Sequence, residues 1–146
     1  MASTYNELGI ELMATGENAG TWGDKTNSNL NLIQQAIAGY QAVTVNGTGA
    51  TTLAMTDATI SNARNQILKL SGTITGNITV TVPNSIEKSY IVFNSTSGAH
   101  TVQFKTVSGT GPTFAATDKG TKLVYADGTN VVDTGFSSAG IDAVVD

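Results

Sequence analysis

The chain has 146 residues, a formal net charge of -4 and only 12% charged residues, and it contains no cysteine. The lack of cysteine excludes disulfides and thiolate metal sites. The seven basic residues are scattered, which argues against a nucleic-acid binder, and no apolar run of about 18 residues indicates a membrane span. Thr, Ser, Gly and Asn are abundant, and these residues favour strands joined by tight turns.

Residues 1–39 form the first of two predicted regions, an N-terminal arm followed by one helix. Residues 7–13 are interpreted as a short helical turn, and residues 16–23 as a loop. The N-terminus has no basic segment followed by an apolar one, so no signal peptide is expected. We assign attachment or oligomerisation to this region.

A single amphipathic helix is predicted at about residues 25–38. Leu30, Ile33, Ala36 and Ile37 recur at the spacing of one helical face. Gly39 is a natural residue to end the helix. The candidates for its N-cap, each with a side-chain oxygen that can accept a free backbone N–H, are Asp24, Thr26 and Asn27.

Residues 40–146 are predicted to form a β-domain, because apolar residues recur there with a period of two between frequent turn formers. The mainly β fold class is an antiparallel β-sandwich or a barrel-like domain. The best hairpin signal is Asp127-Gly128, which lies between two apolar runs. The predicted strands are residues 41–45, 66–70, 78–82, 90–93, 101–106, 122–125 and 130–133.

Two further features of the β-domain bear on its architecture. No fixed-period repeat is visible, which disfavours a solenoid. Residues 137–146 are partly apolar, and Ile141, Val144 and Val145 either dock on a neighbouring subunit or form the last strand.

The residue types that carry catalysis or bind metals are sparse. His100 is the one histidine, and no serine lies in a G-x-S-x-G elbow. The glycine-rich stretches at 47–50 and 108–111 are interpreted as turns, because neither is followed by the Lys-Ser or Lys-Thr of a phosphate loop. The trio Asp127, Asn130 and Asp133 does not match a helix-flanked calcium loop. We therefore expect no enzyme activity, no cofactor and no metal.

The segment from Asn18 to Ile33 contains a Gly-Thr-Trp-Gly turn that leads into a helix with asparagines at intervals, and it resembles a segment frequent in tailed-phage virion proteins. Trp22 is expected to fold over the start of the helix as a core anchor. The second half is similar to structural proteins of marine and cyanobacterial phages, through residues 78–83, 90–94, 97–102, 109–111 and 124–131. The resemblance implies a tail fibre, a tail-associated part or another virion component, and many such appendages are homotrimers.

These observations together predict a non-enzymatic virion protein, with other virion proteins in the tail or capsid as its partners. The apolar stripe of the helix lacks partners within the chain, so we expect a homotrimer in which Trp22, Leu30, Ile33 and Ile37 serve attachment or oligomerisation. The leading interpretation is a tail fibre component, adaptor or short spike. Capsid decoration is the alternative, since one compact β-domain with an anchoring arm also fits that role.

A glycan-binding module that recognises the host surface is the alternative from another functional class. Such a site needs exposed aromatic rings beside amide or carboxylate groups. The candidate rings Tyr90, Phe93, Phe104 and Tyr125 fall in predicted strands, where a core position is the simpler interpretation.

Overall fold

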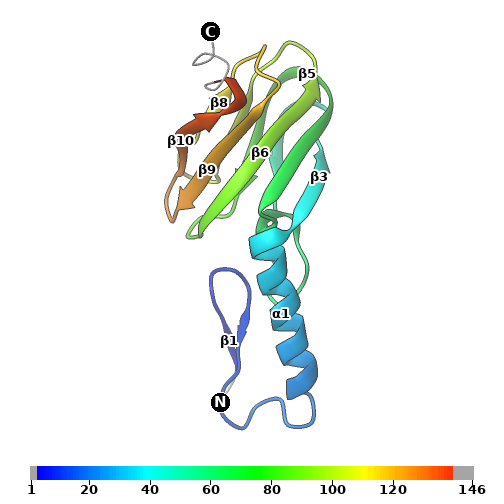
Figure 1. Ribbon diagram of the computed structural model, residues 1–146, viewed down its shortest axis with the longest axis vertical. Coiled ribbons are helices and arrows are strands. Elements are labelled where there is room, and N and C mark those ends of the chain that lie inside the picture. The colour runs from blue at the N-terminus through cyan, green and yellow to red at the C-terminus, as the bar shows by residue number, and fades with distance from the viewer. Residues whose placement is uncertain (1–2, 140–146) are drawn as a thin grey trace.

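The computed structural model describes residues 3–139 and shows an elongated molecule with a stem and a head. A long helix and a small hairpin make the stem, and a two-layered β-structure makes the head (Figure 1). The mainly β fold with one helix confirms the predicted class. The predicted apolar residues Ile141, Val144 and Val145 lie outside the described residues.

The stem begins with a hairpin of two short strands, β1 (Thr4–Tyr5) and β2 (Glu11–Leu12), in which Thr4 pairs with Leu12. The Asn6 side-chain oxygen accepts hydrogen bonds from the backbone N–H groups of Leu8 and Ile10, at 3.1 and 3.0 Å. The expectation of a helical turn at residues 7–13 is therefore wrong. The asparagine side chain supplies the local hydrogen bonds that close a turn instead.

The helix α1 (Trp22–Ala38) starts about three residues before its predicted beginning. The predicted caps Asp24, Thr26 and Asn27 lie inside it, and Thr21 takes the capping position. Gly39 ends the helix as predicted, but with an extended backbone at a φ of -71°. A side chain at Gly39 would run into the Gln35 carbonyl oxygen and the Asn65 amide, so close packing explains this glycine.

The head contains the remaining strands and one short 3₁₀ helix. Three of the seven predicted strands lie wholly within a strand, and each of the other four, residues 41–45, 66–70, 101–106 and 130–133, extends one residue beyond a strand end. The predicted turn at 47–50 is instead the start of a strand. The elements are β3 (Tyr40–Thr44), β4 (Gly47–Thr52), η1 (Asn62–Arg64), β5 (Ile67–Val82), β6 (Glu87–Ser97), β7 (Val102–Thr106), β8 (Thr113–Phe114), β9 (Thr121–Asp127) and β10 (Val131–Ser137).

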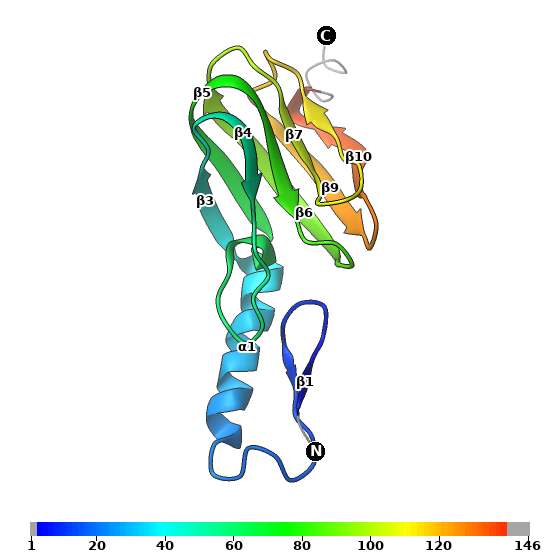
Figure 2. The ribbon, with the colours of Figure 1, turned by 180° about the vertical axis from the view of Figure 1, so that it is seen from behind.

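The strand β5 is long and belongs to both layers of the head. Its first half pairs in parallel with β3 and β6, and its second half pairs in parallel with β4 and β7. Figure 2 shows the second layer from behind, with β4 and β7 on that side. The predicted antiparallel pairing holds for β6 with β9, β9 with β10 and β7 with β8, whereas the centre of the head is parallel.

The parallel centre arises because the chain winds through both layers three times. Ile67 pairs with Ile91 and Ile78 pairs with Val102, so each step from the second turn to the third is 24 residues. The step from the first turn to the second is longer, since Tyr40 pairs with Ile67 and Gly49 with Ile78. This unequal spacing hides the winding from a search for a fixed-period repeat.

Asparagines hold successive turns of the chain together at the corners. The side-chain oxygens of Asn46, Asn77 and Asn84 accept hydrogen bonds from the backbone N–H groups of residues 73, 101 and 108, at 3.1, 3.0 and 3.1 Å. Gly72 lies where β5 bends, with a φ of +117°, and a side chain there would strike the Val45 carbonyl oxygen. A glycine is therefore required at this corner.

The core fills the space between the two layers. Leu68 and Leu70 from the first half of β5 face inward, as do Val80 and Val82 from its second half, and all are fully buried. Tyr90 and Phe104 meet edge to face, with ring centroids 5.5 Å apart. The core belongs to the head, so the stem depends on polar contacts with it and on the few apolar side chains that the helix buries.

Candidate functional site

Asn29 and Glu11 join the helix to the hairpin. The Asn29 side-chain oxygen accepts from the Glu11 backbone N–H at 3.0 Å, and the Asn29 amide donates to the Glu11 carbonyl oxygen at 2.9 Å. The Glu11 carboxylate accepts from Asn18 at 2.9 Å and lies 3.7 Å from the Lys25 ammonium. The Asn18 hydrogen bond, with help from Lys25, lowers the pKa of Glu11. The stem is thus fastened by polar groups of the same Asn18–Ile33 motif.

Arg64 joins the stem to the loop that precedes β5. Its guanidinium is fully buried and donates to the carbonyl oxygens of Leu8, Thr56 and Thr59, at 2.6, 2.5 and 2.5 Å. It also donates to the Gln35 side-chain oxygen of the helix, at 3.1 Å. Burial lowers the pKa of Arg64, but a guanidinium keeps its charge in proteins. One cation therefore fixes the hairpin, the helix and the loop to each other.

Lys88 joins the end of the helix to the head, and Tyr90 holds the 3₁₀ helix η1 in place beside this joint. The Lys88 ammonium donates to the Ala36 carbonyl oxygen at 2.7 Å, where a cation complements the negative end of the helix. Burial lowers the pKa of Lys88 to about 8. The Tyr90 hydroxyl donates to the Ala63 carbonyl oxygen at 2.5 Å, and burial raises the pKa of this phenol. These contacts hold the stem in one direction relative to the head.

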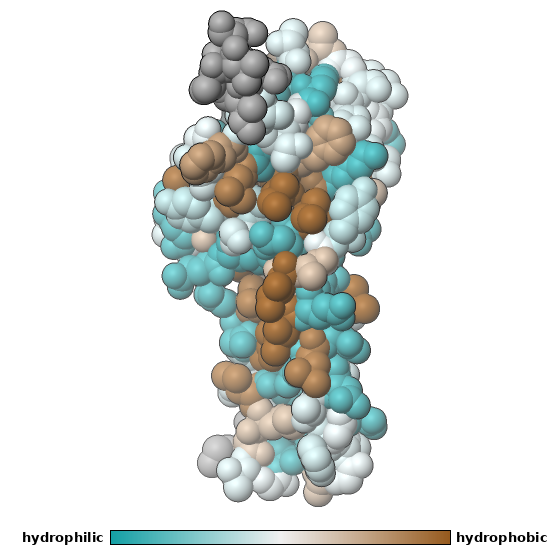
Figure 3. All heavy atoms as spheres, viewed as in Figure 1, coloured by the Kyte–Doolittle hydropathy of each residue, from teal (hydrophilic) through white to brown (hydrophobic). Residues whose placement is uncertain are grey.

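The helix leaves one apolar stripe uncovered. Its buried residues are Leu32 and Ala36, whereas Leu30, Ile33 and Ile37 are 58%, 39% and 71% exposed. Figure 3 shows apolar side chains running along the stem and continuing onto the head. We call Leu30, Ile33 and Ile37 the helix stripe. It is the candidate association surface, because large apolar side chains at helical spacing rarely remain in water without a partner.

Trp22 does not fold over the helix start as a core anchor, because its side chain is 65% exposed. The surrounding turn has few apolar groups for it to meet. The interpretation of Trp22 as an attachment residue stays a prediction, and its exposure leaves the ring available for a contact outside the chain.

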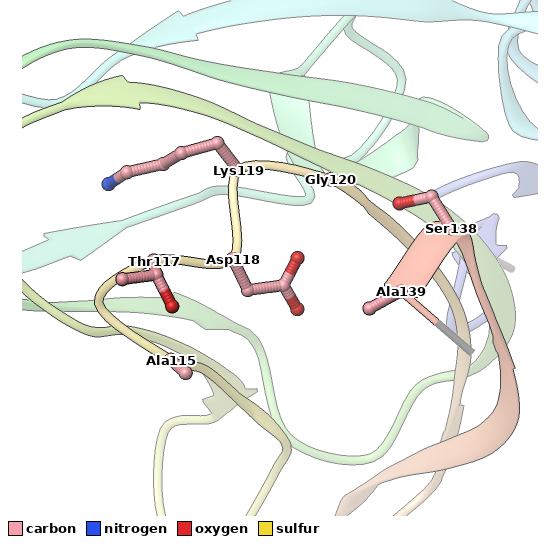
Figure 4. Close-up of a pocket in the computed structure, with 7 residues that line it drawn as sticks. All are labelled: Ala115, Thr117, Asp118, Lys119, Gly120, Ser138 and Ala139. Carbon is pink, nitrogen blue, oxygen red and sulfur yellow. The ribbon is translucent and has the colours of Figure 1, made fainter. Parts of the chain in front are cut away.

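The head also has a hollow of about 560 Å³ beside the end of β10. Figure 4 shows that the Asp118 carboxylate points into it, while the Lys119 side chain points away. Lys119 donates to the Thr96 hydroxyl and the Gly98 carbonyl oxygen, and Asp118 lies 3.7 Å from the Lys122 ammonium. Both charged groups therefore have partners within the head.

The other chemistry-bearing residues also have structural surroundings. His100 lies in the turn between β6 and β7. The Asp127 carboxylate accepts from the backbone N–H groups of Thr129 and Asn130, and these bonds lower its pKa. Across residues 3–139, no group of three or more His, Asp or Glu side chains is placed to hold a metal. No helix in that range has the length and apolar character to cross a membrane.

Sequence reasoning found the helix stripe but missed the residues that orient it. Arg64 is an isolated arginine in a polar loop, and nothing in the neighbouring sequence marks it as buried. Asn29 belongs to the Asn18–Ile33 motif, which does not by itself mark its contact with the hairpin. Its residue type does suggest such a contact, because a side-chain amide can both donate to and accept from the backbone of a strand beside the helix.

No protein-family model, curated protein or solved structure matches the chain.

Proposed function

We propose that the protein is a non-enzymatic structural component of a tailed-phage virion, most simply a homotrimeric tail fibre part, adaptor or short spike. The observation that carries the proposal is the exposed helix stripe of Leu30, Ile33 and Ile37 on a stem that polar contacts join to the head. The resemblance of residues 18–33 to a segment of tailed-phage virion proteins supplies the biological setting.

The stem is suited to holding several copies together. A helix with an apolar stripe on its outer side buries that stripe when identical helices pack side by side. The Asn29 and Arg64 contacts fix the direction of the stripe before assembly. Preorganised surfaces lose less conformational entropy on association, so these polar contacts favour assembly although they lie outside the stripe.

Capsid decoration is the alternative within the same class. A compact head on a short stem also suits a protein that docks on a shell, and the exposed Trp22 at the far end of the stem offers an anchor. The two roles differ in copy number, because a decoration protein follows the many shell subunits and a tail part does not.

A glycan-binding role draws support from two tyrosines on strands of the head. Tyr40 and Tyr125 are 59% and 41% exposed, and exposed aromatic rings can stack on sugar rings. Binding of host-surface polysaccharide that is lost in Tyr125→Ala, with folding intact, supports this role. Equal binding by the variant removes it.

The experiment that tests the proposal is quantitative mass spectrometry of purified virions, with the major capsid protein as the internal reference. A small copy number divisible by three supports a tail part. A number close to that of the shell protein supports decoration. Absence of the chain from purified virions contradicts both.

A further inference from the structure

A row of apolar side chains crosses the outer face of the head and continues the helix stripe. The strand register aligns Tyr40 with Ile67, Ile67 with Ile91, and Ile91 with Leu123, across four neighbouring strands. Phe136 lies beyond Leu123 on β10 and lines a hollow with it. The residues that follow Ile67, Ile91 and Leu123 along their strands are buried in the core; they are Leu68, Val92 and Val124. Side chains alternate between the two faces of a strand, so the row faces outward.

The two ends of this row differ in shape. Tyr40 projects at the β3 edge and is 59% exposed. At the β10 edge there is a hollow of about 310 Å³, lined by Ile91, Thr121, Leu123, Phe136, Ser137 and Ser138. One edge therefore carries an aromatic projection, and the opposite edge carries an uncharged hollow.

The exposed apolar area of this surface lies at the upper end of what a single chain usually leaves in water. With roughly 200 Å² as the full surface of a large apolar side chain, the exposed parts of Tyr40, Phe136 and the helix stripe amount to on the order of 600 Å². A standard interface takes about 800 Å² from each partner, and a copy in a ring makes two interfaces, so this apolar area supplies a part of each. The half-buried Ile67, Ile91 and Leu123 add to the total.

We infer that the surface is covered by other copies of this chain, arranged in a closed ring, with Tyr40 of one copy packed into the Phe136 hollow of the next. The inference rests on the self-association proposed above and names its contact. Figure 3 shows apolar side chains of the stem and of the head on one face of the molecule. A rotation axis that runs parallel to the stem in front of this face brings the helix stripe and the row of every copy to the centre of the ring. A ring needs two different complementary edges on each copy, and β3 and β10 supply them.

The charge of the row also favours copies of the same chain. Symmetry brings identical residues near each other around an axis, where like charges repel. The row is uncharged across five strands. Lys69 lies on the same face, and its ammonium is directed over the Phe93 ring, 5.9 Å from the centroid.

The test uses engineered cysteines, since the native chain has none. In one copy, Tyr40 and Phe136 are separated by four strand spacings, about 19 Å, which is too far for a disulfide. Oxidation of the Tyr40→Cys/Phe136→Cys double variant is therefore expected to give a ladder of covalent dimers and trimers. Each single cysteine variant should give at most covalent dimers. In the control Val107→Cys/Phe136→Cys, one cysteine lies at an exposed site after β7 instead of at Tyr40, and no covalent trimer is expected.

A second variant guards against effects of the cysteines on folding. Tyr40→Ser removes the projection from an exposed position and is expected to raise the dissociation constant of the assembly at least tenfold, while Val107→Ser leaves it unchanged. Native mass spectrometry that shows only monomers of the unmodified chain defeats the proposed self-association itself. Oligomers that form without the trimer ladder and tolerate Tyr40→Ser overturn this contact alone, and another occupant then covers the row.

Discussion

The buried guanidinium of Arg64 provides the sharpest test of how the stem is held to the head. Arg64→Met keeps most of the side-chain volume but removes four hydrogen bonds, three of them to backbone carbonyl oxygens. A buried polar group left without a partner costs about 1–3 kcal/mol. Because removal of the cation also removes the cost of burying it, we expect a net loss of about 3–5 kcal/mol in the free energy of unfolding.

The assay is urea unfolding followed by circular dichroism at one fixed protein concentration, since association adds to apparent stability. Hydrogen exchange should show faster exchange of the hairpin amides at residues 4–12, whose turn is fastened through the Leu8 carbonyl oxygen. Lys105→Met is the control, because it removes a half-buried cation on β7 away from this network. A loss below about 1 kcal/mol for Arg64→Met, equal to that of the control, refutes the reasoning.

Three further outcomes are expected. The double variant Ile33→Asp/Ile37→Asp should give folded monomers. Both side chains are exposed in a single copy, and a charge buried between copies without a partner prevents association. A trimer of unchanged stability contradicts this expectation, and Val107→Asp is the control. Gly39→Ala should lower the free energy of unfolding by about 2 kcal/mol or more, because the added methyl group clashes with Gln35. Gly23→Ala places the methyl group in open space on the helix and should raise the free energy of unfolding by about 0.5–1 kcal/mol, measured by thermal unfolding. Burial raises the pKa of Tyr90 above the ordinary phenol value of about 10, so the stability that the neutral phenol contributes is fully present below pH 10 and is lost as the pH rises above it. Tyr90→Phe should weaken this alkaline loss of stability, measured by urea unfolding at increasing pH. A stability profile identical to that of the unmodified chain rejects the assignment.

The mainly β class and the helix were predictable because their signals are local. The change from helical spacing to a period of two occurs near Gly39, where α1 ends and β3 begins. The Asp127-Gly128 hairpin also follows local rules, since the aspartate side chain caps the turn and Gly128 adopts a φ of +95°. Helical spacing predicted the apolar stripe, and the lack of partners for it within the chain predicted its exposure.

The parallel pairing was not predictable in this way, because it depends on contacts between residues far apart in the sequence. Strand β4 was mistaken for a turn, since its glycines are typical of turns and its partner, the second half of β5, is about 29 residues away. The corner asparagines Asn77 and Asn84 look like ordinary turn residues. Their role appears only when the next turn of the chain lies beside them.

The burial of single residues was not predictable where it depends on their surroundings in the folded chain. Trp22 was expected to fold over the start of the helix as a core anchor, yet its side chain is 65% exposed. Arg64 carries no local signal of burial, yet it is fully buried, because carbonyl oxygens of the hairpin turn and of the loop at residues 56–59 converge on it. Charge and size alone do not reveal such a convergence.

The central claim is that this chain acts as a self-associating structural part, and the mass of the purified chain under native conditions tests it most directly. At micromolar concentration we predict a species of three times 15.0 kDa, which dissociates when Ile33 and Ile37 are both replaced by aspartate. A monomer throughout the micromolar range would contradict the claim, because the helix stripe would then remain in water with no partner of its own kind.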